Sequence, residues 1–186
     1  MKPLLIEIVS EEIPAGYIDP ALQAMKDLMA KRLSQSRIEH GAMEVFGTPR
    51  RLALIVQDVA ELQTSITSEV VGPPKTAAFD AQGQPTKAAE GFAKSQGASV
   101  KELRIKKTAK GEYMCVKKRE RGRSSWKLLQ TIIPEVITAI PFPKSMRWAD
   151  LSLVYTRPMH GILALFGDRI IPFKMENLKS GRRTLG

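Results

Sequence analysis

Two adjacent arginines fall in the segment Thr48-Pro49-Arg50-Arg51, which the sequence predicts as a turn between two strands. A guanidinium group is a planar fork of donors that can bind phosphate or carboxylate oxygens in pairs. The segment therefore suggests recognition of an anionic group at a turn.

A second segment, Phe142-Pro143-Lys144-Ser145-Met146-Arg147-Trp148, combines two cations with two large aromatic side chains. Aromatic rings stack on nucleic-acid bases, and cations contact the phosphates between them. An alternative interpretation is an extended aromatic plug into the core, from which Lys144 and Arg147 reach outward to solvent.

Positive charge is concentrated between Lys101 and Lys127. That segment holds eleven Lys and Arg against three Glu, so it carries +8 of the formal +10 of the 186 residues. Clustered cations attract polyanions and release condensed counterions on binding. RNA, DNA and acidic membranes all fit this charge, and so does a solvated strand pair whose basic side chains serve solubility.

The sequence has no Walker-type phosphate loop, no dinucleotide-binding glycine motif and no nucleophile elbow. Its single cysteine, Cys115, excludes an intrachain disulfide, and with only His40 and His160 beside it the usual zinc ligand sets cannot be assembled. We therefore expect neither a metal site nor a catalytic residue in this chain.

Three groups of residues keep an alternative chemical reading. Cys115 lies near two lysines that could activate its thiol, although a buried structural cysteine is the more common case. His160 precedes a predicted strand, where it could act as a general base or simply bond a neighbouring backbone group. Three acidic residues, Glu7, Glu11 and Glu12, could bind a cation or an amine. The alternative is that they form an acidic edge exposed to solvent.

The composition, 43% hydrophobic and 26% charged, is typical of a globular protein and excludes a disordered chain. The longest apolar runs, such as residues 162–166, are far shorter than the roughly 20 residues that span a bilayer. The N-terminal Met1-Lys2-Pro3 does not open a secretory signal. We therefore expect a cytoplasmic, soluble protein of one or two domains, without a membrane partner.

Hydrophobic periodicity predicts alternating strands and helices. The expected strands lie at 4–9, 43–46, 51–59, 70–71, 112–118, 161–166 and 169–173. Three helices are expected: the first begins at Asp19-Pro20, and the other two cover 86–96 and 125–140. The mixture of hairpins and separate helices predicts an α+β fold with antiparallel or mixed sheets and packed helices.

Individual residues refine these boundaries. Thr86 is the expected N-cap of the second helix and Gly97 its stop, while Pro134 should kink the third helix or divide it in two. Gly167-Asp168 is a hairpin signature. Exposed or irregular segments are expected as a loop at 72–86, a protruding charged turn at 119–123 and a polar, basic tail after 174.

Taken in order along the chain, several motifs resemble the N-terminal region of the β subunit of bacterial glycyl-tRNA synthetase. They are Leu5-Ile6-Glu7-Ile8, Glu11-Glu12-Ile13-Pro14-Ala15, Thr48-Pro49-Arg50-Arg51-Leu52-Ala53, Gly72-Pro73-Pro74, Ala78-Phe79-Asp80, residues 85–93 and residues 142–148. The resemblance covers essentially the whole chain but only about the first quarter of the family's length. A His-Arg-Phe stretch that follows the segment Ser180–Gly186 in the family is missing, so we expect a fragment of a longer chain.

The resemblance implies a part in protein biosynthesis, as one portion of an α2β2 enzyme that charges tRNA(Gly) with glycine using ATP. In the family the α subunit carries the class II core that uses ATP and Mg, and the β subunit chiefly recognises tRNA. The implied partners are tRNA(Gly), the α subunit and the remainder of the β subunit, and no cofactor is expected in this portion. From the resemblance we expect the family's later helical region and its C-terminal anticodon-binding domain to lie outside these 186 residues.

The resemblance also implies a domain division and a fold similar to the B3/B4-like domain of the phenylalanine enzyme's β subunit. Residues 1–175 would form the N-terminal α+β region, as one domain or as two subdomains, and residues 176–186 would form a basic tail leading to the missing domains. The residues expected to contact tRNA are Arg50, Arg51, Lys87, Lys117, Lys118, Arg119, Arg121, Arg123, Lys144, Arg147 and Trp148.

Two alternatives to a non-catalytic tRNA-binding portion stay open. An aminoacyl-tRNA hydrolase would need a group that activates water, supplied by His160 or one of the three acidic residues named above. A purely structural scaffold would use the apolar helix over 125–140 and the segment 142–148 to pack on other parts of the enzyme.

Overall fold

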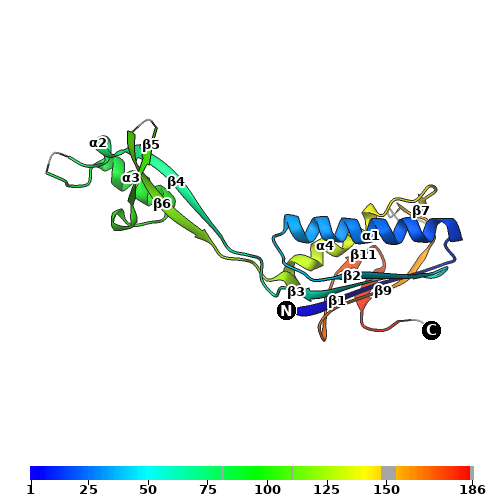
Figure 1. Ribbon diagram of the computed structural model, residues 1–186. Coiled ribbons are helices and arrows are strands. Elements are labelled where there is room, and N and C mark those ends of the chain that lie inside the picture. Colours follow the sequence, from blue (N-terminus) through cyan, green and yellow to red (C-terminus); the bar gives the residue numbers. More distant parts are fainter. Residues whose placement is uncertain (81, 110, 148–153, 185–186) are drawn as a thin grey trace. The chain divides into compact units, whose positions relative to one another are not determined.

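The computed structural model describes residues 1–80, 82–109, 111–147 and 154–184 (Figure 1). The chain divides into two compact units: unit 1 consists of residues 1–64 and 123–186, and unit 2 of residues 65–122. Unit 2 is thus inserted into unit 1 along the sequence, and each unit has its own sheet and its own buried cluster.

The elements of unit 1 are β1 (Lys2–Ser10), α1 (Ala15–Gln35), β2 (Met43–Thr48), β3 (Arg51–Val59), α4 (Ser125–Ala139), β7 (Met146–Arg147), β8 (Val154–Tyr155), β9 (Met159–Phe166), β10 (Arg169–Ile170), β11 (Lys174–Met175) and β12 (Leu178–Gly181). Those of unit 2 are β4 (Ile66–Pro74), α2 (Lys75–Ala78), α3 (Lys87–Gln96), the short 3-10 helix η1 (Val100–Glu102), β5 (Arg104–Thr108) and β6 (Gly111–Glu120).

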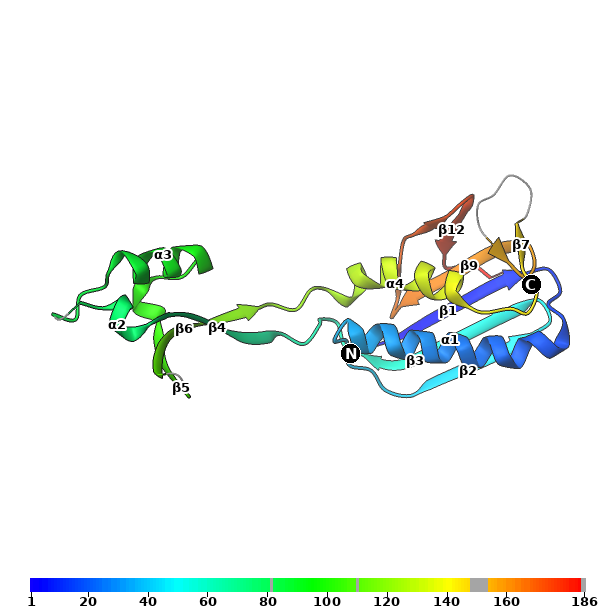
Figure 2. The same ribbon diagram turned by 90° about the horizontal axis from the view of Figure 1, so that it is seen from above.

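The main sheet of unit 1 has the order β11-β12-β9-β1-β3-β2, with β10 also paired to β9. Its pairings are antiparallel except that β12 runs parallel to β9. Helices α1 and α4 lie on one face of this sheet (Figures 1 and 2). The predicted α+β class with antiparallel and mixed sheets is confirmed.

Strict alternation in the central strands positions the core of unit 1. In β1, Leu4, Ile6 and Ile8 are buried, and the corresponding side chains of β3 are buried beside them. Successive strand residues point to opposite faces, so these side chains meet the helices while the residues between them face the other way. The second face of the sheet therefore carries the polar residues of β1 and β3, among them Glu7 and Arg51.

Helix α1 begins at Ala15 rather than at the predicted Pro20. Its first turn closes where the Tyr17 N–H donates to the Pro14 carbonyl oxygen at 2.8 Å. Pro20 then lies inside the helix, where its missing N–H removes one backbone hydrogen bond. The apolar face that compensates is the predicted one, with Met25 and Met29 fully buried.

Helix α4 is a single helix that contains Pro134, so the expected division into two helices is wrong. An interior proline costs about 3 kcal/mol. The helix buries apolar residues on both sides of the proline, among them Ile133 and Ile137, and this burial offsets the loss.

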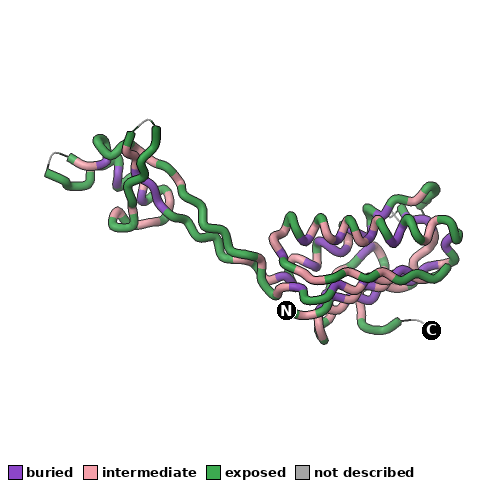
Figure 3. The backbone as a smooth tube through the Cα atoms, viewed as in Figure 1, coloured by how far each residue is buried: buried purple, intermediate pink, exposed green. Residues whose placement is uncertain are grey.

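Unit 2 is a three-stranded sheet in the order β4-β6-β5, with α2 and α3 packed on one face. Its buried cluster is small: Ala78, Ala89 and Met114, with two half-buried neighbours. Gly72 lets the Phe92 ring of α3 approach the β4 backbone, because a Cβ there would lie 2.5 Å from the ring. In Figure 3 most of this unit is exposed, whereas buried residues recur throughout unit 1.

Strand β4 has nine residues, although only residues 70–71 were expected as a strand. It runs on through Gly72-Pro73-Pro74, with a register shift between Val71 and Pro74. Prolines are tolerated here because β4 is an edge strand. Helix α2 follows at once, so part of the segment expected as an exposed loop at 72–86 is regular structure.

The longer β4 also explains a second difference. The charged turn expected at 119–123 begins two residues late, because Arg119 and Glu120 belong to β6 and pair with Thr67 and Ile66. Strand β5 pairs with the other edge of β6 and was not expected. Helix α3 ends as predicted, at Gly97 with φ of 68°, but the Thr86 hydroxyl donates to Ala77 O instead of capping it.

The C-terminal hairpin of β9 and β10 turns as predicted at Gly167, which has φ of 60°. The following segment differs from the expected tail, because residues 178–181 form β12 on the edge of β9. Ser180 secures this strand: its hydroxyl donates to Ile171 O at 2.7 Å and accepts from Phe173 N at 2.9 Å.

Candidate nucleic-acid interface

Strand β6 organises the basic surface of unit 2, because β4 and β5 flank it on either side. Its Met114 points to the face on which α2 and α3 pack. Side chains alternate along a strand, so the residues between belong to the opposite face. On β6 these are Tyr113, Cys115, Lys117 and Arg119.

The opposite face gathers four cations around one carboxylate. The cations are Arg104, Lys106, Lys117 and Arg119, placed on this face by the register of β5 and β6. Lys106 Nζ lies 2.8 Å from Glu69 Oε2, and Lys117 Nζ lies 3.8 Å from Glu69 Oε1. Four cations and one carboxylate leave an excess of three positive charges on this face, which we call the β6 basic face.

The ionisation of Glu69 reflects this surplus. The hydrogen bond from Lys106 holds the pKa of Glu69 below its ordinary value of 4.5, and the charges of Lys106, Lys117 and Arg104 lower it further. The same hydrogen bond raises the pKa of Lys106 above 10.5. Within the described part of the chain, Arg119 has no carboxylate within ion-pair distance, so its donors can bind an external anion.

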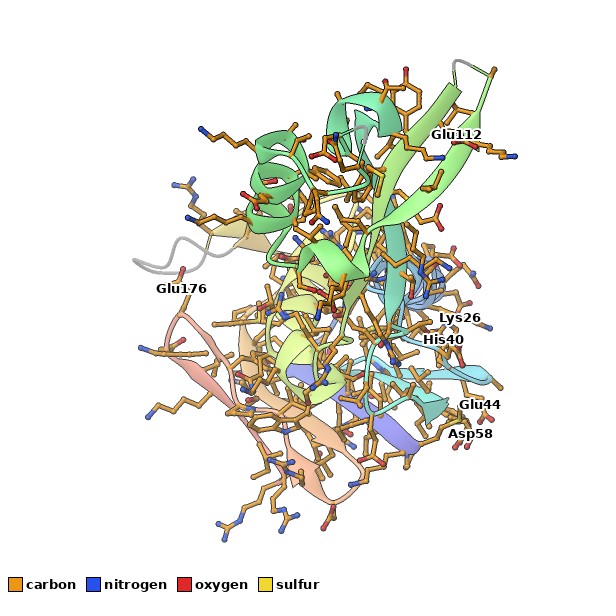
Figure 4. The ribbon with its side chains drawn as sticks, turned by 90° about the vertical axis from the view of Figure 1, so that its left-hand side faces the viewer. Lys26, His40, Glu44, Asp58, Glu112 and Glu176 are labelled. Atoms are coloured by element: carbon orange, nitrogen blue, oxygen red, sulfur yellow. The ribbon has the colours of Figure 1, made fainter. Side chains whose placement is uncertain are left out.

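The β5–β6 hairpin carries a second acidic centre, Glu112, labelled in Figure 4. Lys75 Nζ lies 2.9 Å from Glu112 Oε2, and Lys107 Nζ lies 3.8 Å from Glu112 Oε1. The hydrogen bond from Lys75 is the first cause of a lowered Glu112 pKa. Lys75 and Glu112 border a hollow of about 670 Å³ that is also lined by Phe79 and Tyr113. Two cations here are thus engaged with one acid.

Arg50 and Arg51 lie in unit 1, and each has an acidic neighbour on the N-terminal segment. Arg50 Nη2 lies 3.8 Å from Glu11 Oε2, and both side chains are about half exposed. Arg51 Nε lies 3.5 Å from Glu7 Oε2, and the Glu7 side chain is only 15% exposed. Glu7 also accepts a hydrogen bond from Thr184. Arg51 therefore has a structural role that the arginine pair alone did not indicate.

The aromatic and cationic segment at 142–148 divides between core and surface. The Phe142 ring packs on the core of unit 1 and meets the ring of Tyr155 edge-on, with centroids 4.9 Å apart. Burial raises the pKa of Tyr155. Lys144 and Arg147 are exposed, as in the interpretation of this segment as an aromatic plug. Trp148 lies outside the described residues.

The remaining predicted contacts are distributed over both units. Lys87 is the first residue of α3, Lys118 lies within β6 and Arg121 directly follows it; all three are exposed. The backbone N–H of Arg123 donates to Gln63 Oε1 at 3.0 Å, which secures the return of the chain into unit 1. The structure thus places Lys117 and Arg119 on one face of unit 2. The other two predicted pairs, Arg50 with Arg51 and Lys144 with Arg147, lie in unit 1.

His160 and Glu11 come together although they are far apart in the sequence. His160 Nε2 lies 2.7 Å from Glu11 Oε1. A pocket of about 370 Å³ beside His160 is also lined by three cations that were not predicted as contacts, namely Lys179, Arg182 and Arg183. The adjacent arginines were visible in the sequence, but they fell in a segment interpreted as a tail.

Cys115 is buried at the centre of the unit 2 sheet, as the structural interpretation expects. Over the described ranges, no three His, Cys, Asp or Glu side chains are grouped closely enough to hold a metal ion. In the same ranges, none of the helices has both the length and the apolar character needed to cross a membrane.

Comparison with known proteins places the chain in a family. The family described as "Glycyl-tRNA synthetase beta subunit" matches residues 4–186. The chain is 50% identical over its whole length to the glycine–tRNA ligase beta subunit of Desulfatibacillum aliphaticivorans, covering 27% of that protein. The beta subunit of Syntrophus aciditrophicus is 48% identical over 98% of the chain and that of Desulforamulus reducens 45% over 100%, with 26% and 27% of those proteins covered.

The chain therefore spans about a quarter of the length of the curated relatives that it matches. The match lies in their N-terminal part. The chain belongs to the glycyl-tRNA synthetase β-subunit family.

Proposed function

We propose that this chain is a tRNA-contacting part of a glycine–tRNA ligase β subunit and that unit 2 supplies its principal phosphate contacts. The observation that carries the proposal is the uneven charge. Unit 2 has twelve Lys and Arg against six Asp and Glu in 58 residues, whereas unit 1 has 17 against 13 in 128. The surplus in unit 2 is therefore +6, against +4 in a unit more than twice as large.

The β6 basic face gives that surplus a location. Its cations project from the paired strands of one sheet, so the strand register spaces them along a surface that a phosphate backbone could follow. Lys117 and Arg119 are two residues apart on the same strand and hence on the same face. Lys117 lies 3.8 Å from Glu69, the carboxylate of this face, which also faces Lys106 at 2.8 Å.

The test is tRNA binding across a salt series. Each phosphate contact contributes about −0.9 for a duplex, or −0.7 for a single strand, to the slope of log K against log salt. The double variant Lys117→Gln/Arg119→Gln should therefore flatten the slope by about 1.4 to 1.8. The matched control, Lys26→Gln/Lys31→Gln, removes the same charge from α1 in unit 1 and should leave the slope nearly unchanged (Lys26 is labelled in Figure 4).

A third variant addresses the arginine pair. Arg50→Ala/Arg51→Ala should reduce the slope less than the β6 variant, because both guanidinium groups face a carboxylate, whereas in the β6 pair only Lys117 does so among the described residues. An equal loss of slope in the β6 variant and the α1 control would contradict the proposal, since binding would then depend on total charge alone.

The finer properties of the relatives' enzyme also belong to this proposal. We expect the full-length β subunit to assemble with an α subunit as α2β2 in the cytoplasm, and the α subunit to use ATP and Mg²⁺ for glycine activation. Mixing the two full-length subunits should give a heterotetramer by analytical ultracentrifugation and glycylation of tRNA(Gly). Either subunit alone should give no glycylation.

A second candidate function, hydrolysis of mischarged tRNA, is favoured by one observation. His160 and Glu11 form a close pair, and a carboxylate can orient a histidine that activates water. The measurement is release of amino acid from mischarged tRNA(Gly) by the chain and by His160→Ala. Turnover equal to the uncatalysed rate in both would exclude it.

A further inference from the structure

The pocket beside His160 is built where the parallel strands β9 and β12 lie together in unit 1. Ser180 is opposite Ile162 in this pairing, and Gly181 is opposite Leu163. The pocket has a volume of about 370 Å³ and is lined by both strands and by the two arginines that follow β12. It therefore belongs to one unit and to one continuous sheet.

The lining of this pocket is entirely free of acidic side chains. It includes three permanent cations, Lys179, Arg182 and Arg183, together with His160. Two acids contact residues in this lining or next to it, and both already face cations outside the pocket. Glu11 faces His160 at 2.7 Å and Arg50 at 3.8 Å, and Glu7 accepts a hydrogen bond from Thr184 and faces Arg51 at 3.5 Å. An anion entering the pocket would therefore meet an excess of positive charge.

Two of the cations are positioned by the fold. Arg182 Nη2 donates to the carbonyl oxygen of Asp168 at 2.7 Å, which anchors its guanidinium beside the β9–β10 turn. Lys179 is held in β12, where it pairs with Lys174 of β11. Two like charges on adjacent strands repel each other, and a bound anion would relieve that repulsion.

The floor of the pocket is open because glycines line it. A Cβ built on Gly161 would meet no atom within 4 Å, and one on Gly181 would meet only Arg183 N at 4.0 Å. Neither glycine has a positive φ, so backbone strain does not require it. The absence of side chains at these positions leaves room for a compact group near the cations.

We propose that this pocket binds a phosphate group. Phosphate oxygens accept several donors at once, and arginine forks are well matched to them. The group could belong to an RNA backbone or to a small phosphate such as inorganic phosphate, which share this chemistry. The proposal is independent of the β6 basic face, because the residues of the two sites lie in different units.

The test uses the 186-residue chain and two probes, inorganic phosphate and a short single-stranded RNA. Saturable shifts of the Gly161 and Gly181 amide resonances on phosphate addition, absent with sodium chloride at equal ionic strength, are expected. Shifts with RNA alone would assign the site to the nucleic-acid backbone. No saturable shift with either probe would overturn the proposal.

Two variants separate charge from space. Lys179→Gln/Arg183→Gln should weaken phosphate binding at least tenfold by loss of charge. Gly161→Val should weaken it similarly without a charge change, because a Cβ at this position meets no atom within 4 Å and the added methyl groups would occupy the open space of the pocket. Unchanged thermal unfolding of Gly161→Val shows that the fold is intact.

The control for both is the β6 double variant. Lys117→Gln/Arg119→Gln should bind inorganic phosphate at this pocket as the unmodified chain does. If it loses phosphate binding and the pocket variants do not, the pocket proposal fails while the proposed function stands. If only the pocket variants lose phosphate binding, the pocket proposal is supported, whatever the result of the tRNA-binding test.

Discussion

Units 1 and 2 stabilise themselves in different ways. The core of unit 1 contains 26 buried residues contributed by its strands and both long helices, whereas the corresponding cluster of unit 2 contains three, among the residues described. Unit 2 relies instead on the backbone pairing of its three strands, and it carries ion pairs on its surface, centred on Glu69 and Glu112. Burial thus dominates one unit, and backbone pairing the other.

This difference has a functional meaning. A large core requires apolar residues on facing surfaces, which leaves a smaller share of the sequence for charge. Unit 2 has few core positions, and it can devote its strands to cations that face outward. A weakly buried unit is also expected to open locally at lower free energy than a well-buried one.

The largest effect that would test this contrast is a core truncation in each unit. Leu54→Ala in β3 should destabilise unit 1 by about 2–5 kcal/mol, because a fully buried side chain is lost. Met114→Ala should cost about 2 kcal/mol and open unit 2 while unit 1 stays folded. Native-state hydrogen exchange resolves the two. Simultaneous loss of protection in both units after Met114→Ala would contradict independent stability.

A smaller effect compares two glycines at helix–strand contacts. A Cβ on Gly47 would lie 2.7 Å from Ile18 and 2.8 Å from Leu22, both flexible aliphatic chains. A Cβ on Gly72 would lie 2.5–2.6 Å from the rigid ring of Phe92. We expect about 1 kcal/mol for Gly47→Ala and up to about 3 for Gly72→Ala. Urea unfolding of each variant measures this, and the reverse ranking would show that α3 can shift from β4.

The next effect concerns the acids of β1 and its extension. Glu7→Gln should destabilise unit 1 by about 1 kcal/mol, because Glu7 is 15% exposed and faces Arg51. Glu11→Gln is the matched control and should change stability little, because that side chain is 47% exposed. Both are compared by thermal unfolding. Equal losses would mean that solvent exposure does not distinguish the two ion pairs.

The smallest effect is the pH dependence of unit 2. The pKa of Glu69 is lowered in the folded state, so its pairing with Lys106 stabilises the fold above pH 4.5 and is lost as pH falls through the folded pKa. Lys106 contributes below pH 10.5 and loses its contribution as pH rises above its raised pKa. NMR titration of Glu69 should show a midpoint below 4.5. Lys106→Gln should raise that midpoint, and an unchanged midpoint would exclude the hydrogen bond as the cause.

Local periodicity predicted most of unit 1. The strands β1 and β3 and the helix α1 can be recognised from apolar residues that recur within a short stretch of sequence. The hairpin at Gly167-Asp168 can be recognised from those two residues. Two errors concern prolines: α1 begins before Pro20, and α4 continues through Pro134. At both positions burial of the helix against the core outweighs the lost backbone hydrogen bond of the proline.

Unit 2 and the candidate sites were harder to predict. Strand β5 and the ends of β4 and β6 are exposed and polar, so their strand character comes from pairing between distant segments rather than from a local pattern. The ion pairs of Arg50 and Arg51 are likewise contacts between segments that no spacing in the sequence indicates. The basic segment was found from charge alone, but its division into paired and unpaired cations required the sheet register.

The insertion point of unit 2 affects the entropy of the whole chain. The Gln63 N–H donates to Arg123 O at 2.9 Å, and the next pair outward, Ile66 with Glu120, already belongs to the ladder of unit 2. When unit 2 is unfolded, unit 1 must close a loop of 58 residues, which costs about 2 kcal/mol more than closing a loop of four. The folded ladder holds those ends together in advance. Folding of unit 2 therefore favours folding of unit 1 through the connecting chain.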